Sequence, residues 1–95
     1  MLKIITARTF KEKLIGLIGQ KTIKYGMFFP NVNSIHTFFM KDCIDVIGLN
    51  PIKQITEIHP YVKPNHVLFL KKSVHTLELP KGYSKKYKIG DYIKL

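Results

Sequence analysis

The sequence predicts a mainly β fold, namely a compact antiparallel β-sandwich or barrel-like domain with one short helix near its N-terminus. Short runs of β-branched, aromatic and other apolar residues recur along the chain. Gly, Pro and Asn separate these runs at intervals typical of sandwiches and barrels. A length of 95 residues with 45% hydrophobic residues suits one globular unit. We therefore expect residues 1–95 to form a single domain.

The N-terminal part of the chain holds the one segment with helical periodicity. A β-branched run over residues 2–7 predicts a first strand. Thr9 is followed three positions later by Glu12, a capping box in which each side chain satisfies an amide at the helix start. Apolar residues then recur at helical spacing as far as Gly19, a residue type that commonly ends helices. The pattern predicts a helix over residues 10–18.

The rest of the chain has the periodicity of strands. Asn50-Pro51 and the segment 80–82 predict turns, and we interpret Pro60 and Pro64 as bracketing a loop. The further predicted strands cover residues 25–29, 34–41, 44–49, 52–58, 67–70, 74–79 and 92–95.

Alternation along residues 36–41 places His36, Phe38 and Met40 on one strand face and the intervening residues on the other. We interpret Phe38 and Met40 as core residues, and we expect Phe39 to lie over a partly exposed groove. The reversed assignment of the two faces stays open as an alternative.

The most distinctive segment is HTFFMK at residues 36–41, followed by IDVI at 44–47. Four other blocks occur in order: Arg8 with GLI at 16–18, GMFF at 26–29, LELPKG at 77–82 and IGD at 89–91. Together they resemble the domain of unknown function 192 family, small uncharacterised β-rich proteins of bacteria and archaea, over nearly the whole chain. The resemblance implies a compact β-sandwich-like domain with a short N-terminal helix and no established enzymatic activity.

Two positions depart from the pattern of that family. Family members often carry proline where this chain has Cys43, so the resemblance gives Cys43 no family-wide role. They often carry an acidic, glycine-containing turn where this chain has Asn50-Pro51, which predicts a reshaped hairpin tip.

The net charge of +10 raises the question of an anionic partner. Nearly all of this charge is lysine, and Arg8 is the only arginine. Specific nucleic-acid recognition favours arginine, whose planar fork bonds two acceptors at once, so the composition argues against it. The densest run, at Lys81, Lys85, Lys86 and Lys88, is interpreted as a solvated loop. The alternative is a weak contact with nucleic acid or another anionic surface.

The sequence also gives expectations about compartment. A single cysteine, Cys43, forms no internal disulfide, and no apolar stretch has the length of a signal peptide or a membrane-spanning helix. We expect a soluble cytoplasmic protein with a half-buried thiol. An exported domain that has lost its leader stays open as an alternative.

The candidate ligand-binding residues are His36, Phe39, Lys41, Asp45 and Glu78. Aromatic rings with a few polar groups are typical of a binding cleft, so the sequence favours a non-enzymatic binding or accessory module over an enzyme. The expected ligand is a small polar molecule, a glycan or a peptide strand.

An enzymatic alternative uses the same segment. His36, Asp45 and Glu78 would form an acid–base or hard-metal site if they converged. The competing structural interpretation is that Asp45 and Glu78 accept hydrogen bonds from backbone amides or pair with Lys41.

The remaining reactive side chains carry weaker signals. The four histidines lack zinc-ligand spacing, although His36 and His75 could meet across strands. Cys43 has no flanking residues that mark a nucleophile, and no phosphate- or dinucleotide-binding motif occurs. We predict no metal and no cofactor.

Overall fold

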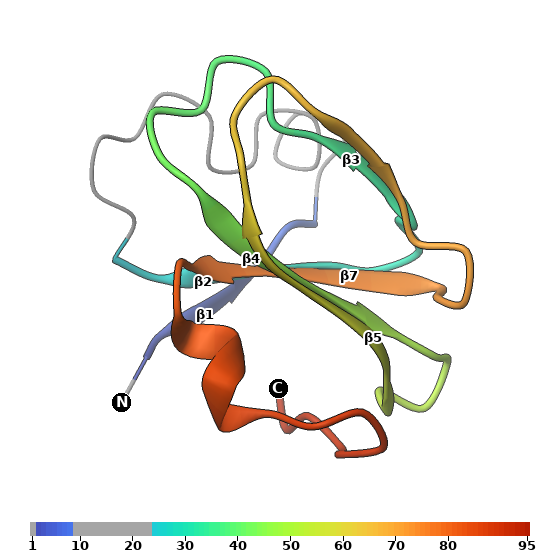
Figure 1. The fold of residues 1–95 in the computed structure, drawn as a ribbon. Helices are drawn as coiled ribbons and strands as arrows, with labels where there is room; N and C mark the ends of the chain where they lie inside the picture. The colour runs from blue at the N-terminus through green and yellow to red at the C-terminus, as the bar shows by residue number, and fades with distance from the viewer. Residues whose placement is uncertain (1, 9–23) are drawn as a thin grey trace.

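The computed structural model describes residues 2–8 and 24–95, and this part of the chain is mainly β, as predicted (Figure 1). It forms seven strands and one short 3-10 helix: β1 (Ile4–Thr6), β2 (Gly26–Phe29), β3 (Ser34–His36), β4 (Ile44–Leu49), β5 (Ile55–Val62), β6 (Val67–Phe69), β7 (His75–Pro80) and η1 (Tyr83–Lys86). The predicted helix over residues 10–18 lies outside the described residues.

Five strands form the larger sheet, in the order β1-β2-β7-β4-β5. β1 runs parallel to β2, and the other pairs are antiparallel. β7 and β4 lie in the middle and are almost entirely buried. β5 lies at the edge. The C-terminal segment pairs only with its start, through a bridge between Gln54 and Tyr92 and hydrogen bonds between Ile55 and residues 90 and 91.

β2 and β4 carry buried residues at consecutive positions rather than at alternate ones, which shows that both faces of the sheet are covered. In Figure 1 the β3–β6 ribbon lies on one side of the sheet, while η1 and the C-terminal segment lie on the other. The ribbon side buries Met27, Phe29, Met40, Ile44, Val46 and Leu70 together. The η1 side buries Phe28, Ile47, Leu49, Ile55, Leu77, Leu79 and Ile93.

β3 and β6 pair antiparallel as a two-stranded ribbon. Ile35 and Leu68 are opposite each other in the ribbon and both pack against the core on the ribbon side. Because side chains alternate along a strand, the neighbouring pair His36 and Val67 points away from that core, as does Phe69.

The predicted strand over residues 34–41 is wrong beyond His36. Thr37 is buried and turns its hydroxyl into the loop after β5, and Phe39 has a positive φ of 66°, which no regular strand tolerates. The core interpretation is confirmed for Met40 and wrong for Phe38, which is 40% exposed.

Two other predicted boundaries are also wrong. Pro60 lies inside β5, at a bulge where Tyr61 adopts a positive φ of 52°, so it does not begin a loop. Residues 92–95 form one bridge and no strand. Within residues 2–8 and 24–95, no helix has the length and apolar character needed to span a membrane.

Candidate functional site

The two predicted site carboxyls lie on opposite faces of the larger sheet. In the β4–β7 register, Asp45 pairs with Leu79 and Val46 pairs with Glu78. Paired residues share a face, so Asp45 points to the η1 side and Glu78 points to the ribbon side. The two carboxyls therefore do not converge, and one proton-transfer centre cannot contain both.

Asp45 is fully buried and acts as a structural acceptor. Its Oδ1 accepts from the Tyr61 amide at 2.9 Å, and its Oδ2 accepts from the Ser84 amide at 2.8 Å. Burial opposes ionisation, but hydrogen bonds from Ser84, Tyr61 and Gly82 outweigh it and lower the pKa of Asp45 below 3.8. This carboxylate accepts hydrogen bonds from one backbone amide at the bulge in β5 and one in the turn into η1. Asp45 therefore has the structural role that the sequence offered as the competing interpretation.

Glu78 is the opposite case. Its side chain is buried on the central strand β7 between Met27 and Val46, and it makes no hydrogen bond to the described residues. Burial raises its pKa to about 8, so the group is largely protonated at pH 7.

The distinctive HTFFMK segment is a tight turn fixed by Thr37. The Thr37 hydroxyl donates to the Lys63 carbonyl at 2.6 Å and accepts from the His66 amide at 2.9 Å. These bonds bind the turn to the loop between β5 and β6. His36 stacks on Phe38 with ring centroids 5.2 Å apart, and the turn leaves Phe39 76% exposed.

His36 and His75, which the sequence left open as a pair across strands, do not meet. His75 accepts from the Asn31 amide at 2.9 Å, and its ring lies 5.5 Å from that of Phe28 on the η1 side. His36 lies on the outer side of the ribbon. Among the residues that the structure describes, no three His, Cys, Asp or Glu side chains gather closely enough to hold a metal ion.

Several of the lysines have specific partners. Lys81 pairs with Asp42 at 2.9 Å. Lys85 and Lys86 lie over the rings of Tyr61 and Tyr83, at 5.9 and 5.0 Å from the ring centroids. The run from Lys81 to Lys88, interpreted from the sequence as a solvated loop, contains the short helix η1. The two lysines of η1 pack against aromatic rings.

The outer side of the β3–β6 ribbon forms an exposed aromatic surface. We call this surface the aromatic face and define it by His36, Phe38, Val67 and Phe69. Val67 is 53% exposed and Phe69 is 65% exposed, and Phe39 is exposed in the adjoining turn. Exposed apolar side chains that gather on one surface are typical of interaction sites.

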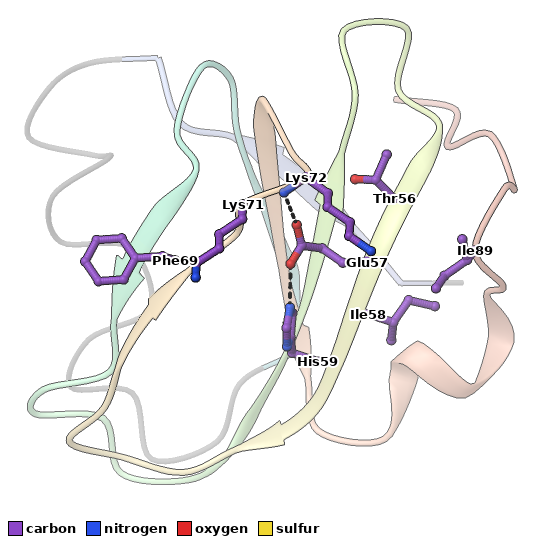
Figure 2. Close-up of a pocket in the computed structure, with 8 residues that line it drawn as sticks. All are labelled: Thr56, Glu57, Ile58, His59, Phe69, Lys71, Lys72 and Ile89. Carbon is purple, nitrogen blue, oxygen red and sulfur yellow. Dashed lines mark hydrogen bonds and ion pairs between the residues drawn. The ribbon is translucent and has the colours of Figure 1, made fainter.

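A groove of about 410 Å³ runs along the edge strand β5 (Figure 2). We call it the β5 groove, and it is lined by Thr56, Glu57, Ile58, His59, Phe69, Lys71, Lys72 and Ile89. Figure 2 shows Ile58 and Ile89 on one side of the β5 ribbon, with Glu57 and His59 on the other. Phe69 belongs to both the groove and the aromatic face.

Glu57 organises the polar wall of the β5 groove. Its carboxylate accepts from the Ser73 hydroxyl at 2.6 Å and the Lys72 amide at 2.9 Å, and it lies 2.8 Å from His59 Nε2. Burial opposes ionisation, but hydrogen bonds from Ser73, His59 and Lys72 outweigh it and lower the pKa of Glu57. This cluster has no signal in the sequence, because a glutamate and a histidine two residues apart form a site only once Ser73 and Lys72 lie against them.

The family model DUF192, described as "Uncharacterized ACR", matches residues 1–95, the whole chain. This chain belongs to the DUF192 family. No curated protein matches it significantly. Two solved structures share the DUF192 fold seen here. A protein of unknown function from Novosphingobium aromaticivorans DSM 12444 has a TM-score of 0.85 and 20% identity, over 99% of this chain and 75% of that one.

The second structure is a "putative transcription regulator" from Sinorhizobium meliloti 1021, with a TM-score of 0.86 and 18% identity, over 98% of this chain and 81% of that one. At these identities the likeness shows the fold alone. The family has no known function, and nothing in these comparisons indicates enzymatic activity.

The position at which this DUF192 chain has Asn50-Pro51 forms a side-chain-organised turn. Asn50 Oδ1 accepts from the amides of Ile52 at 3.1 Å and Gln54 at 2.9 Å, and Lys53 takes a positive φ of 64°. Because the Asn50 side chain accepts from the amides of its own turn, the turn forms without the acidic, glycine-containing sequence that family members often carry here. The other departure, Cys43, is half-buried as expected and donates its amide to Asp42 Oδ1 at 2.8 Å.

Proposed function

We propose that this chain is a non-enzymatic module that binds another polypeptide through the aromatic face. The observation that carries the proposal is the outward display of Val67 and Phe69 from a ribbon whose inner side is fixed to the core, together with exposed Phe38, which follows the ribbon and stacks on His36. Leaving these side chains in water has no folding benefit, whereas covering them with a partner stabilises a complex by about 25 cal/mol per Å² of apolar surface removed from water.

A polypeptide suits this surface better than a small polar ligand or a glycan. Small-molecule sites are concave and bring several polar groups onto one ligand. The carboxyl groups that would serve this purpose, on Asp45 and Glu78, are buried on the two faces of the sheet. What remains of the predicted cleft is an exposed aromatic surface with exposed Lys41 in the adjoining turn.

The charge of the molecule favours an acidic partner. The net charge is +10, and exposed lysines adjoin the segments that form the aromatic face: Lys41 after the turn, Lys63 before β6 and Lys71 after it. Lysines around an apolar surface raise the association rate of a partner of opposite charge and disfavour basic ones.

A site-specific photocross-link tests the proposal in cells of the source organism. Benzoylphenylalanine replaces Phe38, and a matched chain carries it at Tyr92, which is 64% exposed but lies on the C-terminal segment. We expect a discrete cross-linked polypeptide from position 38 and none from position 92. Val67→Asp in the chain labelled at position 38 should abolish the product, because it places a charge in the aromatic face.

Three results would overturn the proposal: the same products from both positions, a product that Val67→Asp leaves unchanged, or a product that nuclease removes. The last would support the nucleic-acid alternative. Lysine-rich composition and the description of the Sinorhizobium meliloti protein are the observations in favour of that alternative.

A further inference from the structure

The β5 groove has the form of a slot for one additional strand. β5 is the edge of the five-stranded sheet, and β4 is its partner along the sheet. The C-terminal segment pairs only with the first residue of β5, Ile55. The Ile55 amide donates to Asp91 O at 2.8 Å, and the Ile55 carbonyl accepts from Gly90 N at 2.9 Å. From Thr56 to His59, no backbone hydrogen bond joins the outer edge of β5 to any other described segment.

An unpaired stretch of edge strand is a template for an extended chain. The first part of β5 already uses its outer edge in this way, through the Gly90–Asp91 pairing. The bulge at Pro60 and Tyr61 ends the regular edge, because proline has no amide hydrogen and Tyr61 has a positive φ. The open part of the edge is therefore short and spans residues 56–59.

The two sides of the slot differ in chemistry. On the ribbon side it is lined by His59, Lys71 and Lys72, and on the η1 side by Ile58 and Ile89. Side chains of a docked strand would alternate between these two sides. An acidic side chain would then face the lysines, and an apolar side chain would face the isoleucines.

Glu57 only partly offsets the positive charge on the ribbon side, because its one carboxylate lies in the same groove as two lysines, Lys71 and Lys72. Its carboxylate is already bonded to Ser73, His59 and the Lys72 amide. The ammonium groups of Lys71 and Lys72 make no ion pair with the residues that the structure describes, so both remain available to a ligand.

We infer that the β5 groove binds an extended polypeptide segment of alternating acidic and apolar residues, which adds to the sheet as a strand beside Thr56–His59. This inference goes beyond the proposed function, because the groove can be filled whether or not the aromatic face has a partner. Phe69, which lines both surfaces, is the point where one partner could contact both.

The test uses a capped hexapeptide of alternating valine and aspartate, titrated into the full chain labelled with ¹⁵N. We expect saturable amide shifts concentrated at residues 56–59, with slowed hydrogen exchange there. An alternating valine–lysine peptide and a valine–aspartate peptide N-methylated at every second amide should each bind at least tenfold more weakly. The first lacks the charge match and the second lacks the main-chain donors.

Variants of the chain locate the site. Lys71→Glu combined with Lys72→Glu should weaken the valine–aspartate peptide at least tenfold, and Ile89→Asp should weaken it similarly. Lys24→Glu is the matched control, since Lys24 is exposed and lies outside the groove, and it should leave affinity unchanged within about twofold. Thermal unfolding confirms that each variant is folded.

The inference is overturned by shifts that map to another surface, by equal binding of the N-methylated peptide, or by an equal loss of affinity in Lys24→Glu. Concentration-dependent shifts at residues 56–59 without peptide would also overturn it, because a second copy of the chain would then occupy the edge. The photocross-link at position 38 is a separate measurement, so either proposal can fail while the other stands.

Discussion

Asp45 and Glu78 lie on adjacent central strands and are both buried, yet their chemistry is opposite. Asp45 accepts backbone amides on both oxygens and is ionised, whereas Glu78 makes no hydrogen bond to the described residues and is largely neutral at pH 7. Burial penalises the charged form of each carboxyl. Hydrogen-bond donors from a bulge and a turn reach Asp45 on one face of the sheet, whereas no described residue donates to Glu78 on the other. Nearby hydrogen-bond donors, rather than the extent of burial, decide whether each carboxyl is ionised.

Removing the Asp45 carboxyl should produce the largest change. Asp45→Ala leaves the amides of Tyr61 and Ser84 buried without acceptors, so we expect the free energy of unfolding at pH 7 to fall by roughly 3–5 kcal/mol. Asp45→Asn keeps one acceptor oxygen and should lose about half as much. Urea denaturation measures both, and a wild-type midpoint for Asp45→Ala would contradict the structural role.

Glu78 should give the second largest effect, with the opposite sign. The unfolded carboxyl ionises above its ordinary pKa of 4.5, while the folded one stays protonated up to about pH 8. The contribution of Glu78 to stability is therefore highest below pH 4.5 and falls as pH rises towards 8, by at most about 1.4 kcal/mol per pH unit.

Glu78→Gln removes this titration. We expect it to resemble wild type at pH 5 and to be more stable by a few kcal/mol at pH 8, as measured by urea denaturation across that range. If the free energies of unfolding of the two proteins changed with pH in parallel, Glu78 would have the same pKa in the folded and the unfolded chain, which would contradict this prediction.

Glu57 lies on the same face as Glu78 but has donors, so it separates the effect of the face from that of hydrogen bonding. Glu57→Gln should lower stability at pH 7 by about 1–2 kcal/mol, since the amide accepts poorly from Ser73 and Lys72. Because the pKa of Glu57 is lowered, its contribution is present above pH 4.5 and is lost as pH falls through the folded pKa. A stabilising substitution would contradict this assignment.

Asp42 should give the smallest effect and serves as the surface control. It pairs with Lys81 in solvent, and the Lys81 ammonium and the Cys43 amide lower its pKa. Exposed ion pairs contribute little, so Asp42→Asn should leave the thermal midpoint within experimental error. A large drop would show that the aspartate beside β4 matters irrespective of burial.

The strands were predictable where hydrophobic pattern alone decides them. β2 and β4 are apolar runs bounded by turn residues, and their buried positions follow directly from the sequence, whereas β6 is an equally apolar run that exposes Val67 and Phe69. The HTFFMK segment was not predictable as a turn. It alternates like a strand, but the Thr37 hydroxyl bonds to a loop more than 25 residues away and Phe39 takes a positive φ.

The candidate site was only partly predictable for the same reason. The sequence groups Asp45 and Glu78 in one candidate site, but the β4–β7 register places them on opposite faces, because they are offset by one residue in the ladder. Glu57 and His59 became a site candidate only through Ser73 and Lys72, which the turn after β6 brings over them.

The donors to Asp45 come from positions 16 and 39 residues away along the chain. A chain that has formed only the β4–β5 hairpin offers this carboxylate the Tyr61 amide but not the Ser84 amide. The hairpin therefore gains its full stability only once the segment after β7 has arrived. We expect the two halves to form together in the folding transition state, so that Asp45→Asn slows folding more than it speeds unfolding. One buried side chain thereby couples the kinetics of distant segments.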